Sequence, residues 1–120
     1  MKEINVFVRH NDLSRVTDII QKHKAGITFF DIQGTGRTPR SVPELVHAYQ
    51  TGRKTVPRFI AGILVISIVS DSTAKLLVEE ILNSFGAQQE EPLGVLFVKD
   101  VLDSYELGTK ISGDKVVDIQ

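Results

Sequence analysis

The run of residues 60–69 constrains the fold of this chain more than any other feature. Eight of the ten residues are Ile, Val, Leu or Ala, and the run is too short to cross a membrane, which takes about 20 residues in a helix. Such β-branched content predicts a strand, and its continuous apolar character predicts a central strand that is buried on both faces. Ser70, Asp71 and Ser72 then offer a helix cap, and the apolar residues from Ala74 to Phe85 recur at helical spacing until Gly86.

A similar strand and helix open the chain. Residues 2–9 hold Ile4, Val6, Phe7 and Val8 and predict a strand. Asn11 or Asp12 can cap the helix that follows, in which the apolar residues are Leu13, Val16, Ile19 and Ile20.

Two more strands complete the pattern. Residues 27–32 form the second strand and run into Gly34, and the last strand extends from Val95 to Val98 or Val101. The order strand, helix, strand, strand, helix, strand predicts an α+β ferredoxin-like βαββαβ domain over residues 1–120, with both helices on one face of an antiparallel sheet. The other face is then bare and apolar, which favours an oligomer. Residues 102–120 are expected to form a loosely ordered tail with a short hairpin.

A long basic loop is expected between the second and third strands. Residues 37–58 carry Arg37, Arg40, Arg53, Lys54 and Arg58 against the single acid Glu44, with a short helical turn conceivable at 44–49. A loop of this length within a small domain is usually functional or disordered. We interpret it as a partner-binding segment that includes Arg40, Tyr49, Arg53 and Lys54; the alternative is a solvated loop.

The segment Gly34-Thr35-Gly36-Arg37 leads into this loop and has two interpretations. Glycines let backbone N–H groups approach an anion, and the guanidinium of Arg37 could grip a phosphate. The alternative is a strand end whose glycines adopt positive φ angles. A P-loop or Rossmann motif is excluded because these glycines do not lie at the start of a helix and are not followed by Lys-Ser or Lys-Thr.

Composition narrows the function classes further. The 120 residues carry a net charge of −1, which gives no overall basic field for nucleic acid, and the absence of Cys excludes disulfides and thiol chemistry. His10, His23 and His47 lack metal-ligand spacing, so no metal site is predicted. No nucleophile motif is present, so we predict no catalytic residue and no enzyme. The start MKEINVFVRH does not have the pattern of a secretory signal, so a cytoplasmic protein is expected.

Several motifs now resemble, in order and spacing, those of the PII (P-II) family of nitrogen-signalling proteins. Gly26-Ile27-Thr28 is similar to the family's Gly-x-Thr, and Gly34-Thr35-Gly36-Arg37 to its Gly-Phe-Gly-Arg before the long T-loop. Residues 94–101 are similar to Gly-Lys-Ile-Phe-Val-x-Asp-Val, and residues 109–114 to Thr-Gly-Glu-x-Gly-Glu. The resemblance covers nearly the whole chain.

The resemblance implies a homotrimer that binds adenine nucleotides, and often 2-oxoglutarate, in clefts between subunits. It implies no required cofactor and a T-loop that contacts a membrane transporter, a metabolic enzyme or a transcription factor. Carried onto this sequence, the implied nucleotide-binding residues are Thr28, Gly34, Gly36, Arg37, Thr38, Gly94 and Lys110.

The chain also departs from the family at charged positions. The position of the family's Lys, next to the glycine before the fourth strand, looks like Val95 here. The stretch that corresponds to the family's Arg-x-Arg after that strand reads Glu106-Leu107-Gly108, and the Gln after Gly-x-Gly-Arg is Thr38. A phosphate oxygen without a cationic partner is costly to desolvate. We therefore expect weaker ATP binding or a preference for ADP or AMP. The alternatives are a PII-like adaptor that is insensitive to ligands, and a ferredoxin-like trimer that binds a metal ion or acts as a small enzyme.

Overall fold

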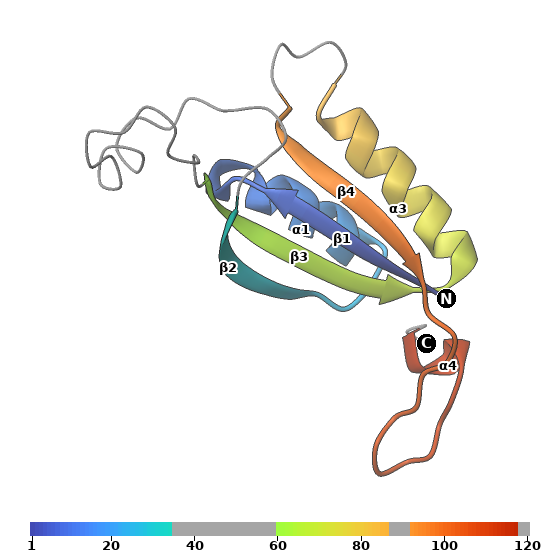
Figure 1. Cartoon of the computed structure of the whole chain (residues 1–120). Coiled ribbons are helices and arrows are strands. Elements are labelled where there is room, and N and C mark those ends of the chain that lie inside the picture. The colour runs from blue at the N-terminus through green and yellow to red at the C-terminus, as the bar shows by residue number, and fades with distance from the viewer. Residues whose placement is uncertain (35–59, 87–91, 118–120) are drawn as a thin grey trace, which may run out of the picture.

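The computed structural model describes residues 1–34, 60–86 and 92–117 and contains one antiparallel sheet with the strand order β2-β3-β1-β4 (Figure 1). The order of elements confirms the ferredoxin-like βαββαβ prediction. The bounds are β1 Lys2–Val8, η1 His10–Asp12, α1 Leu13–Lys22, β2 Thr28–Gly34, β3 Ile60–Val69, α3 Asp71–Ser84, β4 Gly94–Asp100 and α4 Asp114–Val117.

The hydrophobic core lies between one face of the sheet and the two long helices, α1 and α3. Alternate residues of β1 and β3 point toward the helices, as the two-residue period of a strand requires. Val16 and Ile20 of α1, spaced four residues apart, and Leu77 and Ile81 of α3, also four apart, pack on them. The sheet residues of this core are Ile4, Val6, Val8, Ile63, Val65 and Val69.

The opposite face of the sheet has no helix among the described residues, and we call it the open sheet face. The strand register defines it as Glu3, Asn5, Phe7, Thr28, Phe30, Ile32, Gly62, Leu64, Ile66, Ile68, Val95, Phe97 and Lys99. The prediction that the strand 60–69 is central is confirmed. The prediction that it is buried on both faces is wrong for a single chain, because Leu64, Ile66 and Ile68 remain half-exposed.

Element ends differ from the sequence prediction at several places. A 3-10 turn precedes α1, and Asp12 stands at the N-cap position without a side-chain capping hydrogen bond. Its carboxylate instead lies 3.8 Å from the Arg15 guanidinium. The helix α1 ends at Lys22, and Lys24 adopts the left-handed conformation (φ 58°) two residues later. Gly86, with φ 71°, follows the C-cap of α3 as predicted.

The tail after β4 is more regular than the sequence indicated. Tyr105 and Ser112 form an antiparallel bridge, and the Glu106 amide donates to the Ile111 carbonyl oxygen over 2.7 Å, so the predicted hairpin is present. The one-turn helix α4 follows, although the sequence pattern does not predict a helix there. In Figure 1 this tail extends away from the sheet at the end where β4 finishes. The part of the chain that the structure describes contains no helix long and apolar enough to cross a membrane.

Candidate functional site

Two of the predicted nucleotide-binding residues lie at the same end of the sheet but on opposite edge strands. Gly34 ends β2, opposite Ile60, and Gly94 begins β4, opposite Val8. Two strands, β3 and β1, separate them. Three inter-strand steps of about 4.8 Å place the two glycines at least about 14 Å apart. A single chain therefore does not bring them into contact.

Two others, Thr28 and Lys110, lie toward the other end of the molecule. Thr28 begins β2, six residues from Gly34, which corresponds to about 20 Å of strand. Lys110 lies in the tail hairpin, beyond the last residue of β4, and has a left-handed backbone conformation (φ 63°). The remaining predicted residues, Gly36, Arg37, Thr38, Arg40, Tyr49, Arg53 and Lys54, lie outside the described residues, as does the turn expected at 44–49.

A cavity of about 390 Å³ opens beside Gly94, between the end of α3 and the start of β4. Among the predicted nucleotide-binding residues that the structure describes, only Gly94 lines this cavity. The described lining carries no charged side chain and consists of Val6, Val8, Ile81, Leu82, Phe85, Gly86, Pro92, Leu93, Gly94, Val95 and Leu96. Such a lining suits an apolar group or a flat ring and offers no cation to a phosphate.

Gly94 itself is required by close backbone packing. A Cβ atom built at this position would lie 2.3 Å from the carbonyl oxygen of Phe7 on the neighbouring strand β1. The contact is with a backbone atom held in the sheet, which a side-chain rotation cannot relieve. Gly94 thus has a structural role in the pairing of β1 with β4, independently of any ligand.

The tail hairpin is locally organised around an acid. The hydroxyl of Thr109 donates to the Glu106 carboxylate over 2.8 Å, and the amide of Ile111 lies 3.4 Å from the Thr109 hydroxyl oxygen. By the motif resemblance, Glu106 aligns with the first Arg of the family's Arg-x-Arg, and the hairpin presents a carboxylate at this position. A carboxylate repels the negative charge of a polyphosphate.

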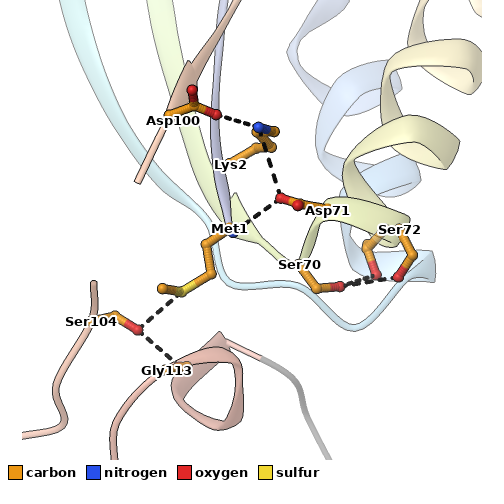
Figure 2. Close-up of polar contacts among 9 residues, drawn as sticks. Met1, Lys2, Ser70, Asp71, Ser72, Asp100, Ser104 and Gly113 are labelled. Atoms are coloured by element: carbon orange, nitrogen blue, oxygen red, sulfur yellow. Dashed lines mark hydrogen bonds and ion pairs between the residues drawn. The ribbon is translucent and has the colours of Figure 1, made fainter. Parts of the chain in front are cut away.

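The base of the tail contacts Met1, and the first two residues of the chain in turn contact Asp71 at the start of α3 (Figure 2). The Val101 amide donates to the Met1 carbonyl oxygen over 3.1 Å, and the Ser104 hydroxyl oxygen lies 3.1 Å from Met1 Sδ. The N-terminal ammonium lies 3.0 Å from the Asp71 carboxylate, and Lys2 pairs with Asp100. The ammonium lowers the pKa of Asp71, and Asp100 raises the pKa of Lys2.

One polar cluster on the open sheet face was not singled out from the sequence. Asn5 Nδ2 donates to Glu3 Oε2 over 2.8 Å, and Lys99 Nζ lies 3.4 Å from the same oxygen. The Asn5 hydrogen bond, supported by Lys99, lowers the pKa of Glu3. The signal in the sequence is the placement of Glu3 and Asn5 between the apolar Ile4 and Val6, which marks them as residues of the face opposite the core.

Metal binding finds no support in the part of the chain covered by residues 1–34, 60–86 and 92–117. No group of three or more His, Asp or Glu side chains is arranged there to hold an ion. His10 pairs with Asp31, with His10 Nε2 3.2 Å from the carboxylate, and His23 lies 2.8 Å from Glu80 on the neighbouring helix.

Comparison with known protein families matches the chain to the family described as Nitrogen regulatory protein P-II over residues 1–110. The chain belongs to the P-II family. The match confirms the resemblance deduced from the motifs and the assignment to nitrogen regulation. P-II proteins are regulators in signal transduction and not enzymes, which agrees with the prediction that the chain is not an enzyme. A comparison with curated proteins finds no match.

Proposed function

We propose that this P-II protein is a cytoplasmic, single-domain homotrimer that senses an adenine nucleotide at the clefts between subunits. The observation that carries the proposal is the separation of the two glycines of the predicted site. Gly34 and Gly94 lie on opposite edges of the sheet, with β3 and β1 between them. We therefore place a ligand that contacts both glycines between the β2 edge of one copy and the β4 edge of the next.

Such a contact joins two different surfaces of identical chains. Repetition of one contact of this kind around an axis gives a closed ring. The open sheet face supports this assembly, because it exposes Phe30 and Phe97 at 50% and 59% and leaves several aliphatic side chains half-buried. Contiguous apolar patches of more than a few hundred Å² are rare on monomers. Three copies are inferred from the P-II family.

The proposed ligand site comprises Thr28, Gly34, Gly36, Arg37, Thr38, Gly94 and Lys110. With Val95 and Glu106 at positions where the family has cations, ADP or AMP should bind more tightly than ATP. The basic loop 37–58 is proposed to contact a membrane transporter or a metabolic enzyme through Arg40, Tyr49, Arg53 and Lys54. Ligand binding shifts the population of loop conformations, and partner binding reciprocally changes the ligand affinity.

Titration calorimetry with ATP, ADP, AMP and cyclic nucleotides tests the ligand. We expect heat with ADP or AMP, and the variant Arg37→Ala should weaken binding about tenfold to a hundredfold, the effect of one charge-assisted hydrogen bond. Lys75→Ala, a cation on the exposed side of α3, is the matched control and should leave binding unchanged. Absence of heat with every nucleotide at millimolar concentration would refute nucleotide sensing. Unfolding of Arg37→Ala would show that this residue is structural.

A second candidate function is a ligand-insensitive adaptor of the P-II type. The acidic Glu106 in the tail hairpin favours it, because the carboxylate repels phosphate. Capture of a partner from the native cell, with and without each nucleotide, separates the two functions. Capture that changes with a nucleotide supports the sensor, and capture that is the same under all conditions supports the adaptor.

A further inference from the structure

Apart from Thr28 on β2, the polar side chains of the open sheet face gather at the corner where β1 begins and β4 ends. Glu3 pairs in register with Lys99 on one side and with Ile68 on the other, and Asn5 pairs with Phe97 and Ile66. The cluster of Glu3, Asn5 and Lys99 is thus bordered by apolar side chains of the same face. We call it the corner cluster.

The corner cluster is already partly removed from water in a single chain. Asn5 is only 7% exposed, whereas the side chain of Glu3 is 26% and that of Lys99 is 66% exposed. Both interactions with the Glu3 carboxylate end on the same oxygen, Oε2. Among the described side chains, Oε1 therefore remains available as an acceptor, and the ammonium of Lys99 has further N–H donors.

The occupant of this face that fits best is a second copy of the chain. The exposed parts of Phe30 and Phe97 alone amount to about 200 Å² of apolar surface, from the area that such side chains bury. One carboxylate and one ammonium side by side make the corner electrically self-complementary, so that Lys99 of one copy can meet Glu3 of the next. A strongly acidic or strongly basic partner would leave one of these charges facing a like charge.

We propose that the corner cluster is the specificity determinant of the contact between copies: Lys99 of one copy binds Glu3 of the next and fixes the register of their open sheet faces. This inference rests on the proposed homotrimer. In another register, the ammonium or the carboxylate would be covered by the apolar residues of a neighbouring face. An unpaired charge in such a place is far more costly than a lost apolar contact, so the alternative registers are disfavoured.

Charge-swapped chains test the inference. The variants Glu3→Gln and Lys99→Met each remove one partner, and the double variant Glu3→Lys/Lys99→Glu exchanges the two charges. Matched controls are Glu79→Gln and Lys75→Met, which alter exposed charges on α3, on the other side of the sheet. Sedimentation gives the self-association of each variant, and native mass spectrometry counts mixed assemblies after wild-type and charge-swapped chains are unfolded and refolded together. Circular dichroism checks that each variant is folded.

We expect each single variant to weaken self-association at least about tenfold, as the loss of a partly buried charge partner does. The charge-swapped chain should associate nearly as well as the wild type but form few mixed assemblies, because every mixed ring contains one Lys–Lys and one Glu–Glu contact. In 1 M salt, where the screening length is about 3 Å, mixing should increase.

Two results would overturn the inference alone: a wild-type trimer whose association is unchanged by both single substitutions, or mixed species at the statistical ratio of about 1:3:3:1 for free exchange within closed trimers. A wild-type chain that remains monomeric would instead refute the proposed trimer, and the inference with it.

Discussion

Truncation of Phe97 to Ala should weaken the association of copies without unfolding the chain. Phe97 lies on the open sheet face and is 59% exposed in a single chain. Full burial of such a side chain contributes about 1.5–3 kcal/mol, so the part still exposed can contribute about 1–2 kcal/mol per copy. Three copies give about 3–5 kcal/mol per trimer, which corresponds to an association constant about a hundredfold to several thousandfold lower.

Sedimentation equilibrium over a range of chain concentrations measures this change. The variant should dissociate at concentrations where the wild type remains assembled. Leu76→Ala is the matched control, because Leu76 is 52% exposed but lies on α3, on the other side of the sheet. Equal association constants for Phe97→Ala and the wild type would refute the argument that this face is covered by other copies. So would an equal loss in Leu76→Ala.

Two further predictions concern the fold of the single chain. Gly94→Ala should lower the free energy of unfolding by about 1–3 kcal/mol in urea denaturation, because its Cβ would meet the Phe7 carbonyl oxygen; Gly26→Ala, with open space around it, should change it little, and equal effects would contradict the packing argument. Hydrogen bonds from Lys22 and then from His23 lower the pKa of Glu80 below its ordinary value of 4.5. The ionised Glu80 therefore stabilises the fold above pH 4.5, and this contribution is lost as the pH falls through the lower pKa of the folded state. Glu80→Gln should therefore flatten the decline of the melting temperature below about pH 4.5, and an unchanged acid limb would show that Glu80 does not contribute.

Much of the fold was predictable because the spacing of apolar residues in the sequence agrees with the packing of the core. The four-residue spacing of Val16 and Ile20, and of Leu77 and Ile81, places each pair on one side of its helix, and the structure buries all four. Local polar chemistry was predicted less well. Asp12 suits an N-cap by residue type, yet its carboxylate faces Arg15, because a side chain near a helix start has several partners within reach.

The candidate site was less predictable, because it depends on the order of strands in space. Gly34 and Gly94 both flank strands in the sequence, and their positions on opposite edges follow only from the order β2-β3-β1-β4. The tail hairpin that carries Lys110 was predicted, but its extension away from the sheet follows only from the three-dimensional arrangement (Figure 1). The family resemblance supplied the residues of the site, whereas the physical reason for a site between chains came from the sheet.

In the proposed sensor, the position of the two glycines on opposite edges of the sheet affects the response to the ligand. A ligand that contacts both edges joins two chains, so ligand binding and chain assembly are thermodynamically linked. At low chain concentration, the dose needed for half-saturation rises, and the added molecule drives assembly. The response then depends on the concentration of the protein as well as on that of the ligand. Binding curves measured at different protein concentrations do not superimpose.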